Sequence, residues 1–143
     1  MDKVPYIREL TTRRYRGRKP VLVRGPDDVI ALLGKLKHEH REQFAVVLLN
    51  ARYEVLGIET VSIGSLNASI VHPREVFLPA IKASAGAVIL VHNHPSGDPE
   101  PSEEDETITQ RLVAVGETLG VPVTDHVIIA RRGCVSLRER KLL

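Results

Sequence analysis

The sequence has little of several residue types, and each shortage excludes a class of protein. Cys134 is the only cysteine among 143 residues, which excludes a disulfide framework or a cysteine-based zinc site within one chain. Aromatic residues make up 3% of the chain and tryptophan is absent, a poor composition for a surface that stacks the bases of single-stranded nucleic acid. There is no apolar run long enough to cross a bilayer and no apolar signal-peptide core. We therefore expect a cytoplasmic protein without a membrane partner.

What remains is an ordinary globular composition with an uneven charge. The length suits one domain, and 43% hydrophobic with 27% charged residues is typical of a folded chain. Residues 1–24 carry eight basic and two acidic side chains, a net charge of +6, whereas the other residues carry −4. We predict a basic N-terminal arm at 1–24 and one folded domain at 25–143. The arm either binds nucleic acid through phosphates or is a solvated tail or a strap that docks on a partner subunit.

The apolar pattern predicts alternating helices and strands. A helix should begin at Gly25-Pro26-Asp27 and run to about residue 40. The remaining predicted elements are strands at 43–49, 54–63, 87–91 and 121–130, a short edge strand at 70–71, helices at 73–84 and 102–119, and a short C-terminal helix at 135–143. This order predicts a mixed α/β fold, with a mixed sheet flanked by helices on both sides.

One segment carries chemistry. His92 and His94 directly follow the apolar strand at 87–91, and side chains two residues apart on an extended segment point to the same side. Asp105 falls in the first turn of the next predicted helix, where it could complete a set of two nitrogens and one carboxylate oxygen. Three protein ligands leave a fourth position for water, as in catalytic zinc sites, although ligand type alone also admits Mn, Co or Fe.

An alternative accounts for Asp105 without a metal. Ser102 and Asp105 have the spacing of a capping box, and an acidic residue in the first turn is favoured by the helix dipole. A serine that caps the helix could still direct its hydroxyl group at an ion. From the residues alone, both interpretations of Asp105 stay open.

The motif His92-Asn93-His94-Pro95, followed by Ser102-x-x-Asp105, resembles the JAMM (MPN-plus) metalloprotease motif. Three short motifs resemble one branch of that superfamily in particular, the RadC-like branch, which is the JAB domain of the RadC DNA repair protein family. These motifs are HPRE (72–75), HNHPSGDPEPS (92–102) and DHVII (125–129). The resemblance implies a JAB/MPN-like fold, a three-layer architecture like that of cytidine deaminases. It also implies hydrolysis of a peptide or isopeptide bond in a protein substrate.

The resemblance assigns roles to individual residues. It implies that His92, His94 and Asp105 bind one zinc ion per chain and that Ser102 stabilises the oxyanion. It assigns general acid–base catalysis to Glu42, with Glu59 and Glu75 as alternatives. The residues alone do not select among these and the other glutamates nearby in sequence, Glu39 and Glu54, since the chemistry requires only that some carboxylate reach the water.

Two departures bear on the substrate. Asn93 stands between the histidines, as in the RadC-like branch, where the eukaryotic deubiquitinases usually have serine or threonine. The helix-hairpin-helix region that often precedes this domain is not expected here. The alternative function is therefore a RadC-like protein associated with DNA repair, acting through DNA or partner binding, or a binding module without activity. A nucleobase deaminase is excluded, because its zinc site needs the two cysteines of Pro-Cys-x-x-Cys and this chain has only Cys134.

The remaining histidines and the cysteine are expected to be structural or exposed. His72 and His126 flank apolar strands, and Asp125-His126 is alternatively a support that orients a metal ligand. Cys134 has no neighbouring group that would activate its thiol.

Overall fold

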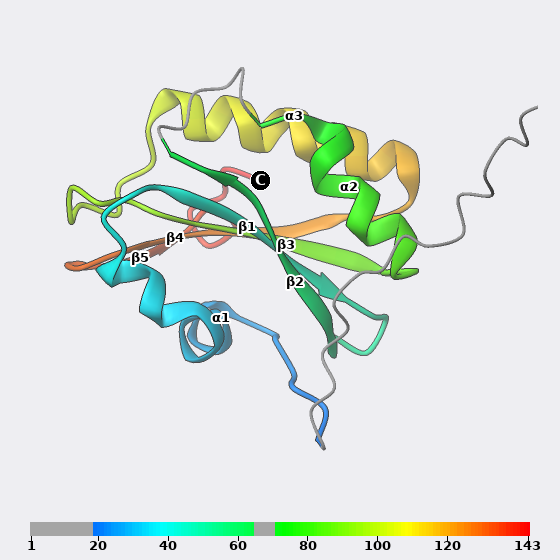
Figure 1. Cartoon of the computed structure of the whole chain (residues 1–143). Coiled ribbons are helices and arrows are strands. Elements are labelled where there is room, and N and C mark those ends of the chain that lie inside the picture. Colours follow the sequence, from blue (N-terminus) through cyan, green and yellow to red (C-terminus); the bar gives the residue numbers. More distant parts are fainter. Residues whose placement is uncertain (1–18, 65–70) are drawn as a thin grey trace, which may run out of the picture.

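The apolar strand that follows residue 86 lies at the centre of a five-stranded mixed sheet in the computed structural model of the chain (Figure 1). The structure describes residues 19–64 and 71–143. The elements, in chain order, are α1 (Pro26–Leu33), the 3₁₀ helix η1 (Gly34–His38), β1 (Gln43–Leu49), β2 (Val55–Ile63), α2 (Pro73–Lys82), β3 (Ala87–Asn93), α3 (Glu103–Leu119), β4 (Val123–Ala130) and β5 (Gly133–Ser136). The strand order is β2-β1-β3-β4-β5, in which only the β3–β4 pair is parallel.

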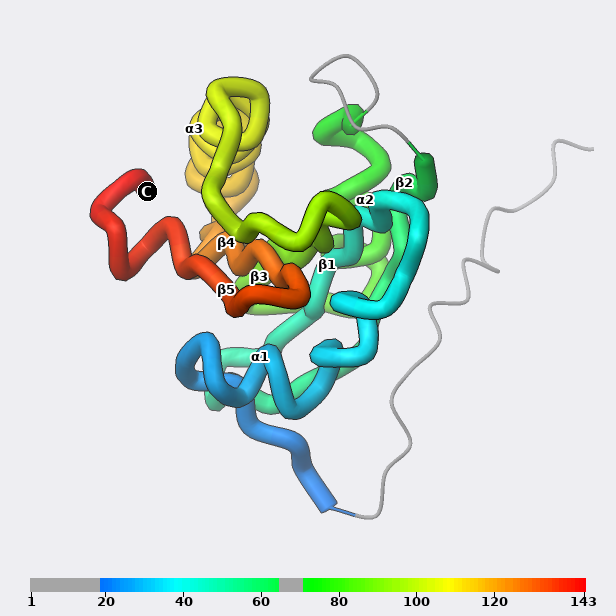
Figure 2. The backbone as a smooth tube through the Cα atoms, turned by 90° about the vertical axis from the view of Figure 1, so that its left-hand side faces the viewer, coloured from blue at the N-terminus to red at the C-terminus, as the bar shows by residue number. Residues whose placement is uncertain are grey.

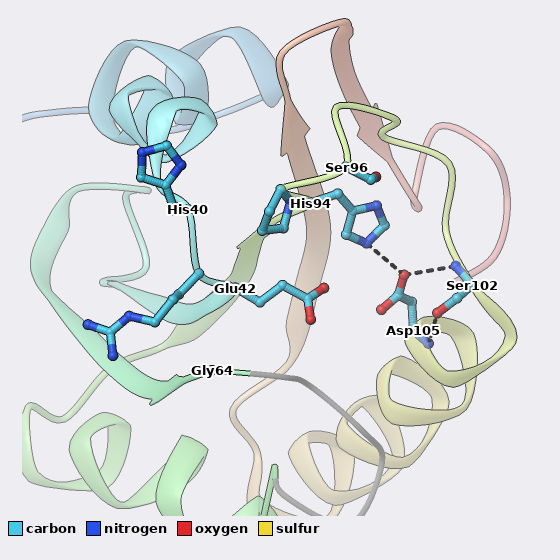
Figure 3. Close-up of a pocket in the computed structure, with 9 residues that line it drawn as sticks. His40, Glu42, Gly64, His94, Ser96, Ser102 and Asp105 are labelled. Carbon is cyan, nitrogen blue, oxygen red and sulfur yellow. Dashed lines mark hydrogen bonds and ion pairs between the residues drawn. The ribbon is translucent and has the colours of Figure 1, made fainter.

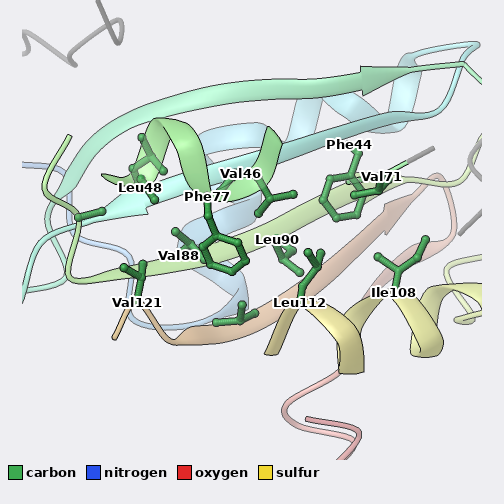
Figure 4. Close-up of a cluster of buried hydrophobic side chains, with 14 residues drawn as sticks. Phe44, Val46, Leu48, Val71, Phe77, Val88, Leu90, Ile108, Leu112 and Val121 are labelled. Carbon is green, nitrogen blue, oxygen red and sulfur yellow. The ribbon is translucent and has the colours of Figure 1, made fainter. Parts of the chain in front are cut away.

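Helices cover both faces of the sheet, which makes three layers (Figure 2). The face beneath α2 and α3 buries a cluster that includes Phe44, Phe77, Leu90 and Leu112 (Figure 4). The opposite face packs against α1 and η1 through a second cluster centred on β1, β3 and β4. Strand β3 is buried along its whole length, as a central strand covered on both faces must be. The predicted mixed α/β, three-layer fold is confirmed.

The C-terminal prediction was wrong. Residues 133–136 form strand β5, which pairs with β4, and turns follow in place of the helix predicted at 135–143. Pairing with β4 satisfies backbone groups that a short helix at the chain end would leave exposed. In the predicted edge strand at 70–71, Ile70 lies outside the described residues, and Val71 is buried without belonging to a strand.

Residues just before α1 belong to the packed structure. Val23 is buried and its backbone N–H donates to the carbonyl of Tyr53, 2.9 Å away, while Val55 N–H donates to the carbonyl of Val21 at 2.8 Å. These bonds attach residues 21–23 to the β1–β2 hairpin. Most of the basic arm predicted at 1–24 lies outside the described residues.

Candidate metal centre

Strand β3, the loop that follows it and helix α3 bring His92, His94 and Asp105 together. His92 is the second-last residue of β3, His94 follows the strand, and Asp105 lies in the first turn of α3. The Nε2 atoms of the two histidines are 3.0 Å apart. Asp105 Oδ1 lies 3.2 Å from His92 Nε2, and Asp105 Oδ2 lies 3.1 Å from His94 Nε2. The three side chains that the motif predicts as metal ligands therefore lie in contact with one another.

The second nitrogen of each histidine ring is already engaged. His94 Nδ1 lies 2.8 Å from the carbonyl oxygen of Asp98, and a carbonyl only accepts, so this nitrogen carries a hydrogen. His92 Nδ1 lies 2.7 Å from Nε2 of the fully buried His126. Both rings thus direct their Nε2 atoms at the carboxylate of Asp105, which leaves those atoms as the ones available to a metal.

Asp105 is both a helix cap and a member of this cluster. Its Oδ2 accepts from the backbone N–H of Ser102 at 2.8 Å, and Ser102 Oγ accepts from the backbone N–H of Asp105 at 3.1 Å. This reciprocal pair is a complete capping box at the start of α3. The two interpretations that the sequence left open are therefore compatible, because the carboxylate that caps the helix also faces both histidines.

The local charges favour a cation. Burial by itself would raise the pKa of Asp105, but the adjacent His92 and His94 side chains and the hydrogen bond from the Ser102 backbone hold it far below its usual value. Partial burial would lower the pKa of His94, but its hydrogen bonds to Asp105 and Asp98 outweigh that effect and raise it. A negative carboxylate therefore faces two ring nitrogens in a partly water-excluded place.

Glu42 lies across a cleft from Asp105 (Figure 3). The cleft has a volume of about 610 Å³ and is lined by His40, Arg41, Glu42, Gly64, His94, Pro95, Ser96, Ser102 and Asp105. One carboxylate oxygen of Glu42 and one ring nitrogen from each of His92 and His94 lie within 4.8 Å of one another. Ser102 lines the same cleft, so four of the five residues to which the resemblance assigns roles lie around one space, and the fifth, His92, is buried against His94 and Asp105.

Asn93 attaches the segment that carries Glu42 to the end of strand β3. Its Oδ1 accepts from the backbone N–H of Gln43 at 2.7 Å, and its Nδ2 donates to the carbonyls of Arg41 at 3.1 Å and Glu39 at 3.4 Å. Asn93 is 1% exposed. It therefore holds the backbone on both sides of Glu42. The sequence indicated only that this position differs from the deubiquitinases, and nothing local could have revealed contacts with residues about fifty positions away.

The donor set fits zinc. Tetrahedral zinc with bonds of about 2.0–2.1 Å places its ligand atoms about 3.3 Å apart. The two ring nitrogens are 3.0 Å apart, and each lies 3.1 or 3.2 Å from a different oxygen of the Asp105 carboxylate, separations close to that spacing. Two imidazoles and one carboxylate, with a cleft on the open side, match the ligand type and the open position of a catalytic zinc site.

The other residues weighed from the sequence lie elsewhere. Glu59 and Glu75 line a separate groove beside α2. Asp125 accepts hydrogen bonds from Ser136 Oγ and from the backbone of Arg138, away from the cluster. Of the pair Asp125-His126, only His126 contacts a histidine of the candidate site.

Comparison with known proteins agrees with this fold and motif. Residues 23–142 match the model of the RadC-like JAB domain family, and the chain belongs to that family. It is 55% identical over 122 residues to a UPF0758 protein of Alkaliphilus metalliredigens, covering 85% of this chain and 53% of that protein. It is 56% identical over 119 residues to a UPF0758 protein of Caldanaerobacter subterraneus subsp. tengcongensis, covering 82% and 51%.

The chain thus spans about half the length of the curated relatives it matches. None of the helices in the part of the chain that the structure describes is long and apolar enough to span a membrane.

Proposed function

We propose that this domain is a zinc-dependent metallopeptidase that hydrolyses a peptide or isopeptide bond. One observation carries the proposal: the Nε2 atoms of His92 and His94 and the carboxylate of Asp105 converge within 3.2 Å at the wall of a cleft that also holds Glu42 and Ser102. Family membership supports it, since the JAB superfamily includes hydrolases.

The five residues to which the resemblance assigns roles divide three tasks in this reaction. His92, His94 and Asp105 would hold the zinc ion, which when bound supplies a Lewis acid that lowers the pKa of water and polarises a carbonyl. Glu42 removes a proton from the attacking water and returns it to the leaving amine. Ser102 uses an oxygen lone pair for its capping bond, so its hydroxyl hydrogen is available to donate to the developing oxyanion.

The first experiment measures metal content. After the protein is incubated with zinc and dialysed, elemental analysis should find about one zinc per chain in the wild type and little in His92→Ala and Asp105→Ala. Asp27→Ala is a matched control, because Asp27 also lies in the first turn of a helix but is exposed. Equal zinc in all variants, or none in the wild type, would contradict the proposal.

A second experiment tests catalysis. Wild type and Glu42→Gln are compared on a panel of peptides and lysine-linked isopeptides by mass spectrometry. Glu42→Gln should keep its zinc and lose turnover by about 10²- to 10⁴-fold. Glu39→Gln is the control, since Glu39 is exposed and only three residues away. Turnover of any of these substrates by Glu42→Gln at the wild-type rate would assign the proton transfer to another group.

A further inference from the structure

A chain of hydrogen bonds runs behind His92, His94 and Asp105, from α3 through β4 to β3. It joins the backbone carbonyl of Asp105, the hydroxyl of Thr109, the ring of His126 and the ring of His92. Thr109 and His126 are both fully buried. His126 lies within DHVII (125–129), but the resemblance assigns no role to either residue, and neither lines the cleft.

The direction of the first bonds follows from elementary hydrogen-bond chemistry. The Thr109 hydroxyl has one hydrogen and lies 2.7 Å from the carbonyl oxygen of Asp105, which can only accept. Thr109 therefore donates to Asp105 and offers a lone pair to His126 Nδ1. His126 Nδ1 must then carry a hydrogen.

The same reasoning extends to His92. The His126 ring is fully buried, and its hydrogen-bond partners are Thr109 and His92, neither of which is a carboxylate. A buried charge without an opposite charge to pair with is costly, so the ring is neutral and a hydrogen on Nδ1 leaves a lone pair on Nε2. That lone pair faces His92 Nδ1 at 2.7 Å, and His92 Nδ1 must be the donor. The lone pair of His92 is consequently on Nε2, the atom that faces Asp105 and His94.

Packing keeps the two rings in this relation. The ring of Phe44 stacks on His92 with centroids 5.8 Å apart and meets His126 edge-on at 5.6 Å. The register of the sheet explains the placement, because Phe44 pairs with His92 across β1 and β3, while parallel pairing sets His126 beside Leu90.

We infer that Thr109 and His126 are positioning residues, which together keep His92 in the tautomer that directs the lone pair of Nε2 at the metal position. This inference rests on the proposed zinc site. Groups that support a metal ligand in this way typically change metal affinity by about 10- to 100-fold when they are removed.

The test compares three threonine variants of the full chain. Thr109→Val keeps the shape of the side chain and removes the hydroxyl, whereas Thr109→Ser restores it. Thr118→Val is the matched control, because Thr118 makes the same bond to the carbonyl four residues earlier on α3 but is exposed and outside the site. Zinc affinity is measured by competition with a chromophoric chelator. The His126 tautomer is read from long-range ¹H–¹⁵N spectra of the metal-free chain.

Thr109→Val should bind zinc about 10- to 100-fold more weakly and should show His126 with a hydrogen on Nε2, since nothing then holds it on Nδ1. Thr109→Ser and Thr118→Val should match the wild type in both measurements. Equal zinc affinity for wild type and Thr109→Val would overturn the inference but leave the proposed function intact. A wild-type chain that binds no zinc would contradict the proposed function and, with it, the positioning role of Thr109 and His126.

Discussion

Asn93 Oδ1 lies 2.7 Å from the backbone nitrogen of Gln43, and this bond joins the end of β3 to the start of β1 beside Glu42. The residue between the two histidines of the motif therefore has a defined task. It places the candidate general base relative to the candidate metal ligands, because Glu42 immediately precedes Gln43 in the chain.

Asn93→Ala should lower the free energy of unfolding by about 2–4 kcal/mol, because it leaves buried backbone groups near Glu42 without their partner. Urea denaturation measures the change. Gln110→Ala removes an amide from an exposed position of α3 and should cost less than about 0.5 kcal/mol. Equal losses for the two variants would mean that the Asn93 bonds contribute nothing specific.

Substitutions at Ser102 can separate helix capping from catalysis. Ser102→Ala removes the cap and should cost about 1 kcal/mol of stability. Ser102→Asp keeps an acceptor for the Asp105 backbone N–H, so stability should stay near that of the wild type. Both variants lack the hydroxyl donor and should lose about 10²- to 10³-fold in turnover. Stability is measured by thermal denaturation and turnover on the peptide panel, and a fully active Ser102→Asp would remove Ser102 from the proposed mechanism.

Gly116 marks a close approach of α3 to the chain that follows it. A Cβ at this position would lie 2.5 Å from the carbonyl oxygen of Val121 and 3.2 Å from the ring of Phe77. Gly116→Ala should therefore destabilise the domain by about 1–3 kcal/mol through overpacking. Gly34→Ala is the control: its Cβ would meet only Ile30 Cγ2 at 3.4 Å, so it should be neutral or stabilise by up to about 1 kcal/mol. Denaturant titration of both variants checks the difference, and a Gly116→Ala chain as stable as the wild type would show that α3 can shift.

Zinc should stabilise the folded domain. At free zinc about 1,000-fold above Kd, binding to the folded state alone contributes about 4 kcal/mol, which corresponds to a rise in Tm of roughly 10 °C for a domain of this size. Calorimetry of the wild type with zinc and with a chelator measures the rise. His94→Ala should show little difference between the two conditions, and an equal rise in that variant would place the bound zinc elsewhere on the chain.

Local sequence determined much of this protein. The fully apolar segment before His92 specified a buried central strand, and the spacing from Ser102 to Asp105 specified a helix start, since both depend on side-chain periodicity and capping within a few residues. The spacing of His92 and His94 likewise predicted that both rings would lie on one side, and the structure brings their Nε2 atoms within 3.0 Å.

Tertiary structure decided what local patterns cannot carry. Among several glutamates, Glu42 reaches the cleft because antiparallel pairing places the start of β1 beside the end of β3. The contact of His126 with His92 depends on the parallel pairing of β3 with β4, and strand β5 forms only because β4 offers it an edge. Strand register joins residues far apart in the chain, and a shift of one residue would turn each of these side chains to the other face of the sheet.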